Sequence, residues 1–315
     1  MTTRRELLIS ATGLTLAVAL PAWVAGAPGE LRIGYQKNGA ILVAKQQGLI
    51  ERRAAALGIG VVKWIEFPAG PPLLEALSVG SIDVGATGDT PPIFAQAAGA
   101  DLLYVARIPA SGSAILVPEH SPLRGLTDLK GKRVAFTKGS SSHNVTVEAL
   151  KSAGLGYADI TPVYLSPADS SAAFARGSVD AWTIWDPFFA LAEKNQRARV
   201  LARVEDIVTS SSFYLANARF AKARPDVLKA VIAELAQAGA WADANRDALA
   251  QVLSEATGVD LEAQRVAVTR ARYSVEPITP EITAQQQAIA DQFHKLGLIP
   301  KPIVVRDAVW TPPAS

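Results

Sequence analysis

Short apolar runs alternate with amphipathic stretches along most of the chain, and this order predicts an α/β fold. Residues 31–35 and 61–67 carry the apolar runs expected of buried strands. Residues 41–49 and 71–77 have apolar positions at helical spacing, and a third strand is expected at 82–85. Strands that alternate with helices indicate a mostly parallel sheet with helices on both faces.

The same order of elements then recurs. Strands are expected at residues 133–136, 160–165 and 179–182, with helices at 140–153 and 168–175. A repeated series of this kind indicates two lobes of related structure.

Individual residues support the duplication. The sequence Gly-Ser-Ile-Asp at 80–83 matches Gly-Ser-Val-Asp at 177–180, at an offset of 177 − 80 = 97. At this offset Asp89 falls on Asp186. A second match, at an offset of 132 − 31 = 101, joins residues 31–37 to residues 132–138. Two matches at nearly one offset predict that the lobes superpose, with Asp83 on Asp180 and Asp89 on Asp186.

From Phe220 onward the pattern is helical. Helices are expected at 226–242, 243–256, 260–272 and 281–296, the last ended by Gly297. At 315 residues and 49% apolar residues, the chain is long enough for two domains and too apolar for disorder.

Charge and composition exclude several classes of function. The net charge is +2 and no basic block exists, so nucleic acid is not an expected partner. The chain has no cysteine, which excludes thiolate zinc sites, disulfides and cysteine nucleophiles. Its 3 histidines lie far apart, and no G-x-S-x-G sequence marks a serine nucleophile. We therefore expect neither a metal nor a cofactor.

Residues 1–27 have the features of a signal peptide. Arg4 and Arg5 precede an apolar core at 14–20, and Ala25-Gly26-Ala27 is an A-x-A cleavage site. The paired arginines favour the twin-arginine route, with an ordinary secretory signal as the alternative. The prediction is a periplasmic protein, cleaved near Ala27.

A serine-rich turn is the strongest candidate for binding chemistry. The expected strand at 133–136 leads through Gly139 to a helix that starts near Ser140, Ser141 and Ser142. One serine can cap the helix, which leaves other hydroxyls beside unpaired N–H groups at its positive end. This arrangement suits an anion with several oxygens. The alternative is a serine-rich helix start that binds nothing.

Four turns follow strands at the edge where open parallel sheets bind ligands: 36–39, 87–90, 137–142 and 182–186. No arginine lies in them, and their basic residues are Lys37 and Lys138. We therefore expect an anion to be held by the helix start at Ser140–His143 rather than by a basic side chain.

Two turns also contain residues with a simpler explanation. Thr90 and Asp186 precede prolines and are explained equally well as helix caps. Asp89 and Asp186 would repel an anion, so we expect them to orient donors. Trp182, which aligns with Gly85, is either a core residue or the wall for an apolar ligand tail.

Several motifs in order resemble one family. RIGYQK, EFPAGP, the stretch from VGSIDVG to QAAGADL, LKGKRVAF, KGSSSHN, IWDP and SFYLA are similar to the periplasmic aliphatic sulfonate-binding proteins of ABC importers. These belong to the nitrate/sulfonate/taurine group of solute-binding proteins. The similarity runs from about Leu31 to Trp310.

The resemblance implies a two-lobed periplasmic binding protein of type II, each lobe a mostly parallel sheet flanked by helices. Lobe 1 would comprise residues 30–115 and 215–315, and lobe 2 residues 116–214, with crossings near 113–118 and 211–215. It also implies a set of ligand-binding residues: Gln36, Asn38, Gly39, Gly88, Asp89, Ser140, Ser141, Ser142, His143, Trp182, Asp186 and Tyr214.

The function implied by the resemblance is that of a non-enzymatic receptor. It would capture aliphatic sulfonates and deliver them to an ABC permease for sulfur acquisition, and we expect it to act as a monomer. A receptor for taurine or nitrate is the nearer alternative. A thiamine-pyrimidine synthase-like enzyme on the same fold is the distant one, and the lack of cysteine disfavours it.

Overall fold

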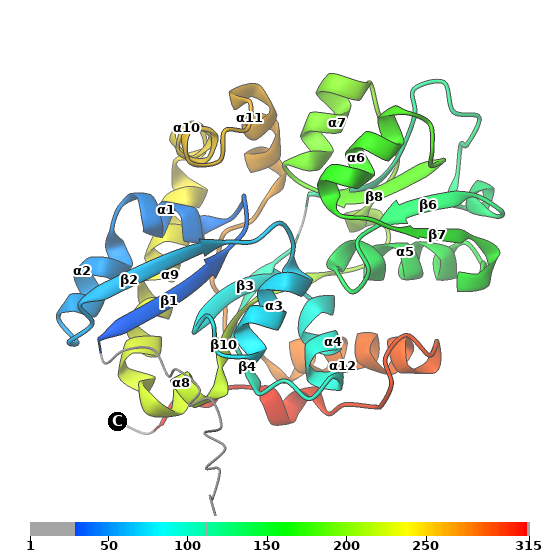
Figure 1. The fold of residues 1–315 in the computed structure, drawn as a ribbon. Helices are drawn as coiled ribbons and strands as arrows, with labels where there is room; N and C mark the ends of the chain where they lie inside the picture. Colours follow the sequence, from blue (N-terminus) through cyan, green and yellow to red (C-terminus); the bar gives the residue numbers. More distant parts are fainter. Residues whose placement is uncertain (1–28, 111, 314–315) are drawn as a thin grey trace, which may run out of the picture.

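The computed structural model describes residues 29–110 and 112–313, and it contains two five-stranded sheets, each covered by helices (Figure 1). The first sheet has the strand order β2-β1-β3-β10-β4 and the second has the order β7-β6-β8-β5-β9. We call each sheet with its covering helices a lobe. The expected signal peptide lies outside the described residues. Within them, no helix combines the length and apolar character needed to cross a membrane.

The strands of the first sheet are β1 (Glu30–Tyr35), β2 (Val61–Glu66), β3 (Val84–Gly88), β4 (Leu102–Pro109) and β10 (Ser211–Asn217). Those of the second are β5 (Ser113–Val117), β6 (Arg133–Phe136), β7 (Thr161–Tyr164), β8 (Ala181–Trp185) and β9 (Arg199–Arg203). The helices are α1 (Ala40–Gln46), α2 (Leu49–Ala55), α3 (Gly70–Ser78), α4 (Thr90–Ala97), α5 (Ser141–Ser152), α6 (Pro167–Ala175), α7 (Phe188–Gln196), α8 (Ala218–Ala223), α9 (Pro225–Ala244), α10 (Arg246–Thr257), α11 (Leu261–Arg270) and α12 (Pro280–Lys295).

Each crossing between the lobes is followed by a strand that joins the newly entered sheet in antiparallel orientation. β5 follows the first crossing and pairs antiparallel with β8 and β9 of the second sheet. β10 follows the second lobe and pairs antiparallel with β3 and β4 of the first. The chain therefore crosses between lobes after β4 ends at Pro109 and before β5 begins at Ser113, and again shortly before Ser211. These crossings lie a few residues earlier than the boundaries at 115/116 and 214/215 expected from the sequence.

The duplication predicted from the sequence is confirmed. β3 and β8 occupy equivalent places in the two sheets and differ by 181 − 84 = 97 residues. The register agrees as well, because Ile33 pairs with Val84 in the first sheet and Val134 pairs with Ala181 in the second. Asp89 and Asp186 each follow the equivalent strand directly.

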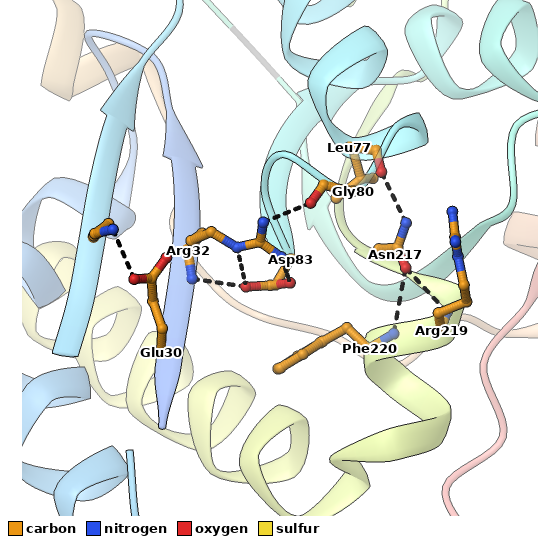
Figure 2. Close-up of polar contacts among 9 residues, drawn as sticks. Glu30, Arg32, Leu77, Gly80, Asp83, Asn217, Arg219 and Phe220 are labelled. Carbon is orange, nitrogen blue, oxygen red and sulfur yellow. Dashed lines mark hydrogen bonds and ion pairs between the residues drawn. The ribbon is translucent and has the colours of Figure 1, made fainter. Parts of the chain in front are cut away.

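A matching ion pair fastens β1 and β6 to their neighbours. Arg32 donates from Nε (3.1 Å) and Nη2 (2.6 Å) to the Asp83 carboxylate, and from Nη1 to the Gly80 carbonyl (Figure 2). Arg133 likewise donates from Nε and Nη2 to the Asp180 carboxylate, and from Nη2 to the Gly177 carbonyl. Both pairs lie near the beginnings of their strands, away from the carboxyl ends where ligands bind. We assign the repeated Gly-Ser-Ile/Val-Asp motif to stability rather than to binding.

The helices after β10 return to the first lobe, as the resemblance implied. α9 packs on α1 and α2, α10 on α1, and α12 on α4. α8 begins at Asn217, whose Oδ1 accepts from the N–H groups of Arg219 and Phe220 (Figure 2).

One expected helix is divided: the stretch 41–49 ends as α1 at Gln46, and Gly48 adopts φ 60° before α2 begins. Glycine accepts this left-handed conformation without the strain that a Cβ would cause.

Candidate functional site

A cavity of about 160 Å³ lies between the two lobes. The carboxyl ends of β3 and β8, the starts of α1, α3 and α5, and both crossings contribute to its wall. The lobes also touch on two opposite sides of this cavity, through α4 and α5 on one side and through α7 and α11 on the other (Figure 1). The structure is therefore in a closed arrangement.

The cavity brings together most of the residues expected from the sequence. Those that line it are Gln36, Asn38, Gly39, Gly88, Ser140, Ser141, Asp186 and Tyr214. Those that do not are Asp89, Ser142, His143 and Trp182. For each residue of the second group, the structure shows another place and another set of contacts.

The start of α5 presents Ser141 to the cavity. Ser140 Oγ donates to the Thr137 carbonyl at 2.7 Å and is also paired with Ser142 Oγ at 2.7 Å. Ser141 Oγ has no hydrogen-bond partner in the described chain, and Ser141 and Ser142 occupy the first two helical positions. The N–H groups of such positions have no acceptor within the helix. One free hydroxyl and free N–H groups at a helix start form a site for an anion.

His143 supports this turn from behind. Its Nδ1 accepts from the Gly139 N–H at 3.2 Å, and its Nε2 is hydrogen-bonded to Tyr157 Oη at 2.9 Å. The ring stacks on Phe136 and meets Phe293 of the first lobe edge to face. Burial, followed by the charge of Lys138, lowers the pKa of His143 to about 3. His143 is thus a neutral, buried ring with both nitrogens engaged, and it does not line the cavity.

Trp182 belongs to the core of the second lobe. It is fully buried, it contacts Phe174, and its place in β8 corresponds to that of Gly85 in β3. A Cβ on Gly85 would lie 2.6 Å from Leu73 Cδ2, so Leu73 fills the space beside the glycine. Of the two explanations for Trp182, these contacts favour the core residue over the wall for a ligand tail. Trp185, at the carboxyl end of the same strand, lines the cavity instead.

Asp89 connects the lobes without lining the cavity. Its Oδ2 accepts from Asn144 Nδ2 of α5 at 2.9 Å and from Ser210 Oγ at the second crossing at 3.0 Å. Its Oδ1 accepts from Thr90 Oγ1, so Thr90 orients the carboxylate rather than capping α4. Burial raises the pKa of Asp89. Asp89 thus orients donors, as expected, but these donors join the lobes.

Asp186 both caps a helix and lines the cavity. Its Oδ1 accepts from the Ala190 N–H at 3.0 Å, in agreement with the capping explanation, and its Oδ2 is buried without a partner in the described residues. Arg270 Nη1 lies 3.5 Å from Oδ1. Burial raises the pKa of Asp186 to about 6, while the nearby Arg270 opposes the shift.

The turn after β1 adds polar groups to the wall. Gln36 Nε2 donates to the Ala86 carbonyl at 3.1 Å, and Asn38 Nδ2 reaches the Asp186 carbonyl across the lobes at 3.4 Å. Gly39 adopts φ 86°, which favours glycine, and begins α1. From the same sheet, β10 contributes Tyr214, whose hydroxyl has no partner among the described residues.

The comparisons with known proteins agree with this architecture. A family described as NMT1/THI5 like matches residues 40–248. A protein named putative aliphatic sulfonates-binding protein, from Escherichia coli strain K12, is 42% identical over 315 residues, which covers 98% of this chain and 97% of the relative.

The chain belongs to the NMT1/THI5-like family.

Solved structures of sulfonate-binding proteins are similar to this chain in both sequence and fold. The alkanesulfonate-binding protein SsuA from Xanthomonas axonopodis pv. citri, bound to MOPS, is 45% identical, with a TM-score of 0.85 over 91% of this chain and 99% of that one. The periplasmic aliphatic sulphonate binding protein SsuA from Escherichia coli is 43% identical, with a TM-score of 0.81 over 90% and 98% of the two chains. The two-lobed type II fold is thereby confirmed.

One segment of the cavity wall was not expected from the sequence. It consists of Ala271, Arg272 and Tyr273, directly after α11, and it lies beyond residue 248, where the NMT1/THI5-like match ends. This segment packs closely on α9, where a Cβ on Gly239 would lie 2.1 Å from the Tyr273 carbonyl oxygen. Arg272 is exposed and has no ion-pair or hydrogen-bond partner in the described chain. The site therefore contains an arginine, although the four strand-end turns hold none.

Other lining residues come from the crossings, including Ala110, Gly112, Ser113, Ser210 and Ser212. The sequence analysis searched the turns that follow parallel strands, where open sheets bind ligands. These residues lie instead where the chain passes between the sheets, so that search did not find them. Trp185, which lines the cavity, lies in the IWDP motif, but the expected site residue from this strand was Trp182.

Proposed function

We propose that the protein is an extracytoplasmic receptor that captures aliphatic sulfonates and delivers them to an ABC importer for sulfur acquisition. One observation carries the proposal: the start of α5 presents Ser141 Oγ and unpaired helix N–H groups to an enclosed cavity between two lobes. Relatives and structures at 42–45% identity are named for sulfonate binding.

The sulfonate would lie against α5. The three oxygens of a sulfonate match a helix start, where N–H groups and the helix dipole favour negative charge. The Ser141 hydroxyl and the hydroxyl of Tyr214 are free to donate. Gly88, on the facing lobe, approaches so closely that a Cβ there would lie 2.7 Å from Ser141 Cβ. Only a residue without a side chain permits this contact, which helps to enclose the anion.

The remainder of the ligand would lie on apolar walls. Ile41, Ile108, Pro109, Trp185 and Leu253 line the cavity. Burial of apolar surface contributes about 25 cal/mol per Å², so about 100 Å² of alkyl chain adds about 2.5 kcal/mol. Arg272 adds a positive charge that attracts anions to the cavity.

The other expected site residues act through their neighbours in this proposal. Ser142 orients Ser140, His143 holds the Gly139 N–H, Asp89 joins the lobes and Trp182 fills the core. Gln36, Asn38, Gly39 and Asp186 shape the wall. We further propose a monomeric protein of the periplasm that does not act as an enzyme, because relatives at 42–43% identity are named as binding proteins.

A zwitterionic sulfonate such as taurine is the second candidate ligand. Asp186 lines the cavity, and its Oδ2 has no partner in the described chain, so it offers an acceptor to an ammonium group. Arg270 already neutralises much of this carboxylate, which favours an uncharged tail.

Thermal unfolding and calorimetry with ethanesulfonate, butanesulfonate, taurine, nitrate and sulfate test the proposal. The alkanesulfonates should raise the unfolding temperature and bind with a defined stoichiometry. Stabilisation by nitrate or sulfate without any by an alkanesulfonate would contradict it. Binding of taurine in preference to ethanesulfonate would assign the second candidate instead.

A further inference from the structure

The α7–α11 contact joins the lobes on the side of the cavity opposite α4 and α5 (Figure 1). α11 follows α10, which packs on α1 of the first lobe, whereas α7 belongs to the second lobe. Ala190 of α7 and Ala263 and Ala267 of α11 are buried together, with Leu191 and Val259 packed around them. Small side chains allow the two helices to approach closely in the closed arrangement.

Arg270 is the polar centre of this contact. Its Nη2 pairs with Glu193 Oε2, its Nη1 lies 3.5 Å from Asp186 Oδ1, and its guanidinium lies 3.8 Å from the centroid of the Phe189 ring. All three partners belong to the start and body of α7 or to the turn before it. The Arg270 side chain is only 16% exposed, so separation of the lobes would break contacts that are largely protected from water.

A second ion pair lies at the rim. Lys194 Nζ lies 2.5 Å from Asp260 Oδ1, and these side chains are 43% and 45% exposed. An exposed pair of this kind contributes little, so Arg270 is the stronger of the two.

From these contacts we propose that Arg270 is a positioning residue which holds the lobes closed and thereby sets the rate at which ligand leaves the cavity. It acts through Asp186, which lines the cavity, and through Glu193 and Phe189, which do not. The proposal rests on the receptor function in one respect, namely that a ligand is released when the lobes separate. Loss of a largely buried charged group at an interface acts mainly on dissociation.

The kinetic test compares Arg270→Gln with Arg265→Gln and Lys194→Gln. Arg265 lies on the same helix, but its partner Glu262 also belongs to α11, so it is a matched control that does not join the lobes. Stopped-flow tryptophan fluorescence with ethanesulfonate should show dissociation about tenfold faster in Arg270→Gln, with association changed by less than about threefold. Lys194→Gln should accelerate dissociation about two- to fourfold, and Arg265→Gln by less than about twofold.

A distance measurement separates closure from ligand affinity. The chain has no cysteine, so Ala55→Cys and Ala172→Cys on exposed positions of α2 and α6 allow specific spin labelling of the two lobes. Pulsed electron resonance on the unliganded protein should show a smaller closed population in Arg270→Gln than in the parent or in Arg265→Gln. Unchanged dissociation together with an unchanged distance distribution would overturn the proposal. If ethanesulfonate fails to bind the parent protein, the receptor function fails, while the distance measurement still decides the role of Arg270.

Discussion

Ser141→Ala is the most direct test of where the anion binds. The substitution removes the one hydroxyl of the α5 start that is free in the structure and leaves the helix, its N–H groups and the Ser140–Ser142 pair intact. A hydrogen bond to a charged group contributes about 1.5–3 kcal/mol. Since every 1.4 kcal/mol is tenfold in affinity, the variant should bind ethanesulfonate about 10- to 100-fold more weakly.

Two variants of neighbouring residues serve as controls. Ser142 Oγ is buried and engaged with Ser140, so Ser142→Ala should cost about 1 kcal/mol of stability and change affinity by less than about threefold. Lys138 is exposed, with its ammonium 5.5 Å from the centroid of the Tyr164 ring, and Lys138→Ala should cost under about 1 kcal/mol of binding. Isothermal calorimetry measures all three. If Lys138→Ala abolishes binding while Ser141→Ala binds like the parent, the anion does not lie at α5.

Three further predictions concern the lobes and the charges of the site. Gly88→Ala places a Cβ 2.7 Å from Ser141 Cβ across the lobes, so it should weaken ethanesulfonate binding at least about tenfold in calorimetry while the unliganded unfolding temperature stays unchanged. A normal affinity would show that Gly88 and Ser141 do not meet in the bound state. Arg272→Gln should slow association and reduce its dependence on salt, measured by stopped-flow at two ionic strengths, because an exposed charge steers anions; an identical salt dependence would argue against a role for Arg272. Burial raises the pKa of Asp186 from the ordinary 3.8 to about 6, so the folded protein loses stability, about 3 kcal/mol, as the pH rises from about 4 through 6 and the buried carboxyl becomes charged. Denaturant titrations should therefore show the stability of the parent falling relative to Asp186→Asn between pH 4 and pH 7, and parallel curves would refute the shift.

The sequence alone determined the repeated parts of this protein. Strand and helix periods are local, so β1 to β3 and β6 to β8 could be identified from their apolar patterns. The duplication followed from two matches at nearly equal offsets. In the structure, Asp83 pairs with Arg32 and Asp180 pairs with Arg133, at equivalent places in the two lobes. The helix start at Ser140 was also a local feature, because serines after a strand and a glycine turn indicate a cap.

Only the tertiary structure decided which side chains reach the cavity. Whether Trp182 or Trp185 faces the ligand depends on the position of β8 relative to the other lobe, and local spacing does not contain that information. His143 and Ser142 follow the same helix start as Ser141 but are turned into hydrogen bonds with their own lobe. The antiparallel strands β5 and β10 have their partners in the opposite half of the chain, so no short-range pattern marks them.

Arg270 and Arg272 show the same limit most clearly. They lie at the end of α11, more than 80 residues from Asp186, and nothing in their neighbourhood in the sequence distinguishes them from other surface arginines. Their places follow from packing: α11 rests on α7, and Gly239 lets the segment after α11 lie against α9. Arg270 gains its role from Asp186, Glu193 and Phe189, which the fold brings to it from the other lobe.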